Sequence, residues 1–230
     1  RDTNGKVGLI QNHCPHRGAS LFFGRNEEAG LRCVYHGWKF DVTGQCVDMP
    51  NEPAESNFKT KVKTVAYRTQ ERGGVVWAYL GSRATPPSLP DLESNMLGDG
   101  STAVAMQREC NWLQALEGDI DTVHAGLLHN GGLKPEEQPE GSFMHYVTKD
   151  RAPRYEAIDT PAGATYGAYR PGPPGQRYWR IAHFLFPIFT MAPSGLLGRD
   201  RLCSVWLPMD DQHTMTFFLL PKYRPPAGQV

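Results

Sequence analysis

Residues 14–38 read CPHRGASLFFGRNEEAGLRCVYHGW and contain two short cysteine–histidine pairs. Cys14 and His16 form the first pair, Cys33 and His36 form the second, and sixteen residues separate the two pairs. Two thiolates and two imidazoles are the ligands of a [2Fe–2S] centre in which histidines replace cysteines on one iron. Glycines beside both pairs allow the tight turns from which four ligands can close on one cluster.

A Cys2His2 zinc site is the alternative for these four residues. Zinc ribbons favour two-residue gaps in both pairs, whereas Cys14 and His16 enclose a single residue and are followed by Arg17. The spacing therefore favours the iron–sulfur centre over zinc.

Three features together resemble the Rieske domain of the Rieske non-haem iron oxygenases, in their phthalate dioxygenase-like branch. They are CPHRGA at 14–19, the sixteen-residue gap, and CVYHGWKFDVTG at 33–44. The resemblance implies that Cys14 and Cys33 bind the outer iron, and that His16 and His36 bind the iron facing the site that receives electrons. Neutral imidazoles in place of thiolates raise the reduction potential of such a cluster.

Residues 110–129, CNWLQALEGDIDTVHAGLLH, predict an amphipathic helix that packs on a core. At about 100° per residue the apolar stripe consists of Leu113, Leu116, Ile120, Val123 and Leu127. Glu117, Asp121 and His124 follow the edge of that stripe, where ionisable side chains are uncommon unless they are paired or bind metal. Asp119 falls on the opposite, solvent-facing side.

Asp121, His124 and His129 match the segment that supplies both histidines of the 2-His-1-carboxylate iron site in the resembling oxygenases. The resemblance thus implies Fe(II) at His124 and His129, with open positions for oxygen and substrate. The five-residue step to His129 does not suit a regular helix, so we expect either a π-type turn near Gly126 or a helix end there. The resemblance also implies a homotrimer, or a multiple of it, in which Asp121 bridges His124 to His36 of a neighbouring subunit.

The third iron ligand of these oxygenases is a carboxylate from a later helix, and we expect it beyond Val230. Asp210 and Asp211 are the last acidic residues of the chain, and they occupy an expected turn between two strands. At the other end, residues 1–5 resemble a hairpin turn whose partner strand would precede residue 1. We therefore expect a fragment that lacks both ends of the oxygenase.

The distribution of strand and helix patterns predicts an α+β fold in two domains. Residues 1–82 form the small all-β Rieske domain, with strands at 62–67 and 75–80, and a proline-rich linker occupies 82–92. Residues 83–230 form the first part of a catalytic domain with an antiparallel sheet. The resemblance implies that this domain has a helix-grip-like fold. Its strands are expected at 143–149, 154–158, 164–169, 177–191, 203–207 and 213–220.

The composition excludes several classes of protein. The chain is 40% hydrophobic and 21% charged, its formal net charge is zero, and it contains neither a basic stripe nor an apolar run of membrane-spanning length. Binding to nucleic acid or to a membrane is therefore not expected. Three of the five cysteines lie outside the pairs and are widely spaced, which is typical of a reduced, cytoplasmic protein.

The resemblance implies the oxygenase component of a multicomponent system. A reductase supplies electrons to the [2Fe–2S] cluster, the cluster passes them to Fe(II), and O2 is used on an aromatic small molecule by mono- or dihydroxylation, ether cleavage or demethylation. If the substrate is a carboxylic acid, Arg180 or Arg154 can bind it bidentately, although ion pairing is the commoner role of an arginine. The alternative is a Rieske-type ferredoxin, which would need no second histidine pair at 110–129.

Overall fold

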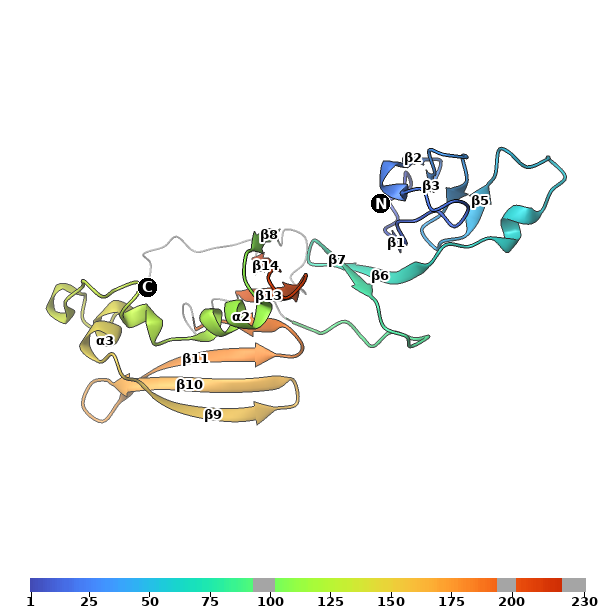
Figure 1. Cartoon of the computed structure of the whole chain (residues 1–230). Coiled ribbons are helices and arrows are strands. Elements are labelled where there is room, and N and C mark those ends of the chain that lie inside the picture. Colours follow the sequence, from blue (N-terminus) through green and yellow to red (C-terminus); the bar gives the residue numbers. More distant parts are fainter. Residues whose placement is uncertain (93–101, 194–201, 221–230) are drawn as a thin grey trace. The chain divides into compact units, whose positions relative to one another are not determined.

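The structure is a computed structural model, and it describes residues 1–92, 102–193 and 202–220. Two compact units divide the chain, Arg1–Asp91 and Leu92–Val230. The division falls at the far end of the proline-rich linker. Figure 1 gives the element labels.

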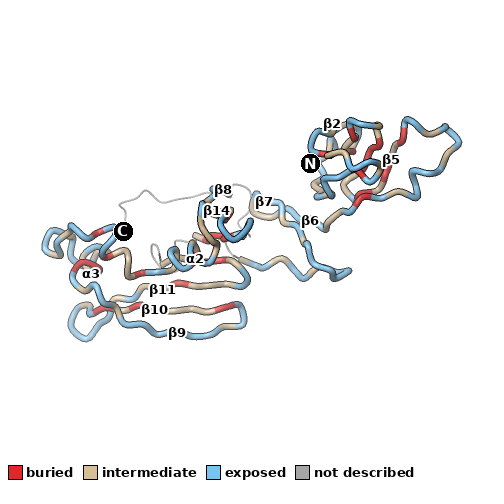
Figure 2. Tube along the Cα trace, in the orientation of Figure 1, coloured by how far each residue is buried: buried red, intermediate tan, exposed pale blue. Residues whose placement is uncertain are grey.

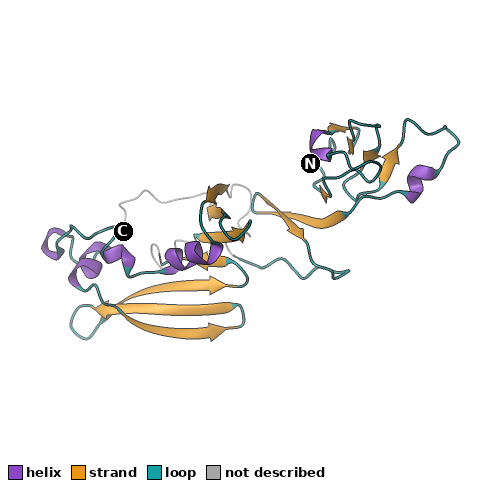
Figure 3. Cartoon of the chain, viewed as in Figure 1, coloured by secondary structure: helices purple, strands orange, loops and turns teal. Residues whose placement is uncertain are grey.

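The first unit contains two small antiparallel sheets (Figures 1 and 3). One has the strand order β2-β3-β4-β5 and the other the order β1-β6-β7. The strands are β1 (Leu9–Ile10), β2 (Arg25–Glu27), β3 (Gly30–Arg32), β4 (Lys39–Phe40), β5 (Cys46–Asp48), β6 (Ala66–Arg72) and β7 (Val75–Tyr79), and the short 3-10 helices are η1 (Leu21–Phe23) and η2 (Phe58–Lys61).

The core of this unit lies between the two cysteine–histidine loops. Its buried members are Cys14, Leu21, Cys33, Trp38, Phe40, Cys46 and Met49. The buried stretches are red in Figure 2 and lie at the centre of the four-stranded sheet region. Both predicted ligand cysteines are therefore part of the core, so the fold around them is stabilised by the same packing that positions their thiols.

The second unit is built on one seven-stranded antiparallel sheet with the order β8-β14-β13-β12-β11-β10-β9. Its strands are β8 (Thr102–Arg108), β9 (Arg154–Thr160), β10 (Gly163–Pro171), β11 (Arg177–Leu185), β12 (Phe189–Met191), β13 (Cys203–Pro208) and β14 (Thr214–Leu220). The helices are α2 (Trp112–Ile120), η3 (His124–Gly126), η4 (Pro135–Glu137) and α3 (Phe143–Lys149). This architecture confirms the predicted α+β class.

The strand register decides which side chains share a face of this sheet. Ala168 of β10 lies opposite Tyr155 of β9 and Arg180 of β11, so these three side chains share one face. Helices cover that face: Tyr146 of α3 stacks on Tyr178 of β11 with ring centroids 4.2 Å apart. The face that carries Arg180 is therefore the helix-covered face of the sheet.

Three predicted strands differ from the structure. Residues 143–149 form helix α3 and not a strand, because the side chain of Ser142 accepts a hydrogen bond from the His145 N–H and caps a helical turn. The expected strand at 177–191 is interrupted at 186–188, where Pro187 lacks a backbone donor. The strand expected at 62–67 instead begins at Ala66, and β8 was not predicted.

Candidate functional site

Two tight loops carry the cysteine–histidine pairs. In the first loop the Gly18 N–H donates to the Cys14 carbonyl at 2.9 Å, and the Cys14 N–H donates to the Ala19 carbonyl at 2.8 Å. In the second loop the Gly37 N–H donates to the Cys33 carbonyl at 3.1 Å. Both loops are thus closed turns that hold a cysteine at the start and a histidine near the tip.

The structure brings these four side chains together. The Cys14 and Cys33 thiols lie within hydrogen-bonding reach of each other, and the His16 and His36 rings lie 4.5 Å apart between centroids. Trp38 stacks on His16 at 4.4 Å and 7°, which fixes the plane of the imidazole. Two thiols on one side and two imidazoles on the other match the donors of a cluster whose two irons take different ligands.

The immediate surroundings of these ligands also suit a [2Fe–2S] cluster. The Nδ1 atom of His16 is buried and has no hydrogen-bond partner among the described residues, which is the environment of a nitrogen that binds a metal. Burial, with the neighbouring His36, lowers the pKa of His16 and so favours the neutral imidazole that a metal requires. Burial raises the pKa of the Cys14 thiol, the backbone hydrogen bonds of His16 and Arg17 lower it in part, and a bound cation would favour the thiolate further.

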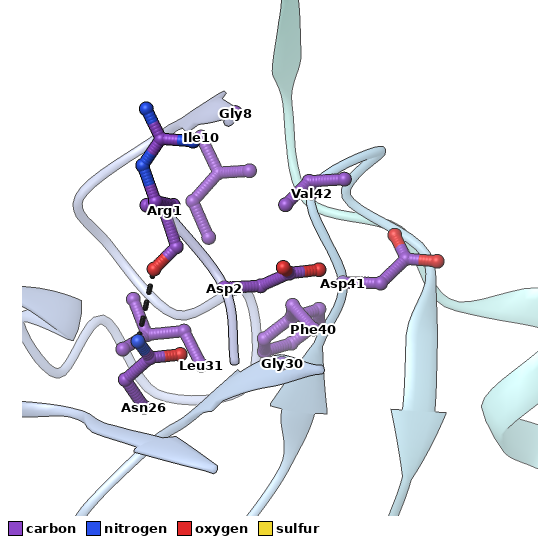
Figure 4. Close-up of a pocket in the computed structure, with 10 residues that line it drawn as sticks. All are labelled: Arg1, Asp2, Gly8, Ile10, Asn26, Gly30, Leu31, Phe40, Asp41 and Val42. Atoms are coloured by element: carbon purple, nitrogen blue, oxygen red, sulfur yellow. Dashed lines mark hydrogen bonds between the residues drawn. The ribbon is translucent and has the colours of Figure 1, made fainter. Parts of the chain in front are cut away.

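A pocket in the same unit contains none of these ligands. Figure 4 shows its lining, which includes Arg1, Leu31 and Phe40, with the Asn26 side-chain amide donating to the Arg1 carbonyl at 2.9 Å. No predicted site residue contributes to it.

The second predicted site follows helix α2. The helix ends at Ile120, and not near Gly126, because Asp121 leaves the helical conformation and uses its carboxylate to accept the Val123 N–H at 2.8 Å. Asp121 Oδ2 also lies 3.2 Å from His124 Nδ1. This contact leaves His124 Nε2 free to bind a metal.

His129 lies beside His124 although it does not share a helix with it. Their ring centroids are 5.1 Å apart, and the chain reaches His129 through the 3-10 turn η3. The chain therefore spans the five residues from His124 to His129 by turns. Neither a π-type turn nor the end of the predicted α-helix occurs near Gly126, where the sequence predicts one or the other. Within the described ranges, no three or more His, Cys, Asp or Glu side chains are grouped closely enough to hold a metal ion.

Asp119 is the residue that the helical wheel placed wrongly. Its carboxylate faces the sheet, where it accepts a hydrogen bond from Thr190 Oγ1 at 2.6 Å, and Trp206 Nε1 donates to the same Thr190 oxygen at 2.7 Å. Burial raises the pKa of Asp119. The predicted orientation of Asp119 was wrong because α2 is only nine residues long and does not bury the whole predicted apolar stripe. Leu113, which belongs to that stripe, is 45% exposed.

Tyr166 of β10 is a second residue that the sequence did not reveal. Its hydroxyl donates to the carbonyl of Ile120, the last residue of α2, and this contact ties the end of the helix to the sheet next to Asp121. Burial raises the pKa of Tyr166, so the hydroxyl keeps its proton. No local pattern marks this residue, because its partner is 46 positions away.

The two arginines considered for a carboxylate lie on opposite faces of the sheet. Arg180 is half-buried on the helix-covered face, its guanidinium lies 3.9 Å from the Phe143 ring centroid, and its Nε atom is buried without a partner in the described part of the chain. Arg154 pairs in register with Tyr169, on the other face, and is exposed. The structure therefore separates Arg154 from the site that follows α2.

Asp210 and Asp211 lie in the turn between β13 and β14, as expected. The Asp210 carboxylate accepts the Gln212 N–H at 2.8 Å and contacts His213 Nδ1 at 2.8 Å. These hydrogen bonds, from the Gln212 backbone and the His213 side chain, lower the pKa of Asp210. The hydrogen bonds of the Asp210 carboxylate are thus made within its own turn.

Among the described residues, no helix is both long enough and apolar enough to cross a membrane.

Two family descriptions match the chain. Residues 1–66 match the Rieske [2Fe-2S] domain, and residues 78–224 match the "LigXa C-terminal domain like" family. The second match covers more than half of the chain.

Several known proteins are similar to the chain along nearly all of its length. The 3-chlorobenzoate-3,4-dioxygenase oxygenase subunit of Comamonas testosteroni is 47% identical over 219 residues, which cover 95% of this chain and 50% of that protein. The phthalate 4,5-dioxygenase oxygenase subunit of Pseudomonas putida is 38% identical over 231 residues, covering 95% and 51%. The chain thus spans about half the length of the curated relatives it matches.

Among solved structures, dicamba monooxygenase bound to dicamba has a similar fold. The TM-score is 0.69 at 21% sequence identity, and the match covers 95% of this chain and 67% of that one. At this identity the likeness concerns the fold.

Proposed function

This chain belongs to the phthalate dioxygenase-like branch of the Rieske non-haem iron oxygenases, and we propose that it carries both metal-binding centres of an oxygenase component that hydroxylates an aromatic acid. The observation that carries the proposal is the presence of two histidine pairs in separate units: His16 with His36, and His124 with His129. A Rieske-type ferredoxin would use only the first pair.

Cys14, Cys33, His16 and His36 would hold the [2Fe–2S] cluster, and His124 and His129 would supply two ligands to Fe(II). When bound, the cluster would supply single electrons and the iron would supply open positions for O2. Asp121 accepts a hydrogen bond from His124 Nδ1–H and thereby orients Nε2 toward the metal position. Tyr166 holds the end of α2, and so the start of this segment, against the sheet.

Electrons would enter from a separate reductase and cross between subunits of a homotrimer. Asp121 is 43% exposed at its side chain, so Oδ1, which accepts the Val123 N–H, could accept a second hydrogen bond from His36 of the partner subunit while Oδ2 stays near His124. A carboxylate between two imidazoles is a short hydrogen-bonded route between the centres.

The substrate is proposed to be a carboxylated aromatic compound. The relatives named for 3-chlorobenzoate and phthalate support this class. Arg180 is the residue that would bind the carboxylate, because it shares the helix-covered face with Tyr166 and Tyr178 and its buried Nε has no partner among the described residues. Hydroxylation, ether cleavage and demethylation would use the same two centres.

Metal analysis and EPR spectroscopy test this function. The chain, reconstituted with iron and sulfide and then reduced, should give the rhombic signal of a two-histidine [2Fe–2S] centre. In the full-length oxygenase, which would also contain the expected carboxylate ligand, an additional iron should bind and should be lost in His124→Ala and in His129→Ala, while the cluster signal stays. A colourless protein with one zinc would refute the cluster, and an unchanged iron content in both variants would favour the ferredoxin alternative.

Substrate binding is tested with Arg180→Met and the matched control Arg154→Met in the oxygenase. Loss of a charge-assisted contact should raise the KM for a benzoate-type substrate by about 10–100-fold, and the KM for a neutral analogue much less. Equal effects of both variants would remove Arg180 from the substrate site.

A further inference from the structure

A single guanidinium group links the second cluster loop to the strands around it. Arg32 is the last residue of β3 and directly precedes Cys33, and its side chain is only 11% exposed. Its Nη1 atom donates to the Gly37 carbonyl at 2.7 Å and to Asp48 Oδ2, on β5, at 2.7 Å. Its Nε atom donates to the Glu27 carboxylate on β2.

The position of the Gly37 carbonyl affects the position of the ligand His36, because Gly37 directly follows His36 in the chain. Gly37 has a φ of +78°, and a Cβ atom there would come within 2.6 Å of Pro50 Cγ. Its N–H already closes the turn onto Cys33. The hydrogen bond from Arg32 therefore fixes the remaining polar group of the residue that sets the direction of the chain after His36.

Arg32 also balances local charge. Its hydrogen bonds lower the pKa of Glu27 and the pKa of Asp48, so both carboxylates are ionised beside it. The neighbouring Lys39 has its own partner, Glu28, at 2.7 Å. Without Arg32, Asp48 would lose this ion pair and Glu27 would keep only the exposed Arg25, beside a region that reduction of a cluster makes more negative.

We propose that Arg32 is a positioning residue of the Rieske centre, which holds the His36 loop through the Gly37 carbonyl and keeps the reduction potential from falling by neutralising Glu27 and Asp48. The inference rests on the proposed [2Fe–2S] cluster. Arg32 would act on the cluster through the loop and through its charge, without touching the irons. Its low exposure makes the charge less screened by salt than that of a surface arginine.

EPR-monitored redox titration of the cluster-loaded chain tests this role. Arg32→Met should make reduction less favourable by about tenfold, which is about 59 mV for one electron. Arg25→Met is the matched control, because Arg25 lies opposite Arg32 in the strand register and also contacts Glu27, yet is 62% exposed. The control should change the equilibrium constant for reduction of the cluster by no more than about twofold.

Two further variants separate charge from geometry. Arg32→Lys keeps the charge but loses the planar group that reaches Glu27 through Nε and both Gly37 and Asp48 through Nη1, so the potential should stay near that of the parent while the EPR line shape changes. Asp48→Asn removes one carboxylate and should shift the potential upward, and it provides a readout if Arg32→Met does not fold.

The proposal is overturned if Arg32→Met and Arg25→Met give the same potential, or if Asp48→Asn leaves the potential unmoved. A parent protein without the rhombic signal would refute the cluster itself, and this role with it. A parent protein with the signal and insensitive variants would refute only the role of Arg32.

Discussion

The two units hold their candidate ligands by contacts of very different sequence range. In the first unit the loops around Cys14 and Cys33 are closed by backbone hydrogen bonds to Gly18 and Gly37, four residues further along the chain. In the second unit the end of α2 is held by Tyr166 and the carboxylate of Asp119 by Thr190, at separations of 46 and 71 residues. The first site is therefore a local structure, whereas the second depends on the assembled sheet.

The largest expected effect is in the local site. Cys33→Ser should abolish the cluster, because an alkoxide is a poor replacement for a thiolate that is buried in the core between two loops. The red-brown absorption and the EPR signal of the reduced protein report the loss. Cys203→Ser, at a buried cysteine of the second unit, should retain both signals. A cluster that survives Cys33→Ser would show that the motif is not the ligand set.

Asp121→Asn tests whether the second site is coupled to the first. The variant keeps the size of the side chain and removes the charge that orients His124, so turnover of the oxygenase should fall by about 10–100-fold while cluster content stays unchanged. Transient kinetics of cluster reoxidation with substrate and O2 measure the step. Reoxidation at the parent rate would mean that Asp121 is not the bridge.

Thr190→Val tests the long-range character of the second site. It removes the donor to Asp119 and the acceptor of Trp206, so the free energy of unfolding of this unit should fall by about 1–3 kcal/mol. Chemical denaturation measures the change. Thr165→Val is the control. The Thr165 hydroxyl contacts His183 in a half-buried position, where a water molecule can replace the lost hydrogen bond. The cluster signal of the first unit should not respond to either variant.

The smallest effect concerns His213, which lies 2.8 Å from Asp210 and 3.0 Å from Glu109. The hydrogen bond to Asp210, with the charges of both carboxylates, raises the pKa of His213 above its ordinary value. A raised pKa in the folded state contributes stability that is fully present below the unfolded pKa and is lost as pH rises through the folded one. The Tm should thus drop slightly between about pH 6 and about pH 8, and His213→Gln should remove that component.

Part of the second site was visible in the sequence and part was not. The resemblance predicted the pair His124 and His129 because both histidines lie within one segment, and their role as iron ligands stays a prediction. The end of the helix that precedes them could not be placed from the sequence, since Asp121 uses its side chain to compete with the helical hydrogen bonds. Helix α3 was missed for a related reason: a single cap at Ser142 decides between helix and strand for a short, apolar and aromatic run.

By itself, the sequence determined the Rieske motif and the α+β class, because each depends on residues that are neighbours in the chain. Tertiary structure alone decided that Asp119 faces Thr190, that Arg180 and Arg154 lie on opposite faces, and that Tyr166 reaches Ile120. Strand register sets these outcomes, and a shift of one residue would exchange the two faces of a strand. The physical reason is that register is chosen by burial over the whole sheet, which no short segment encodes.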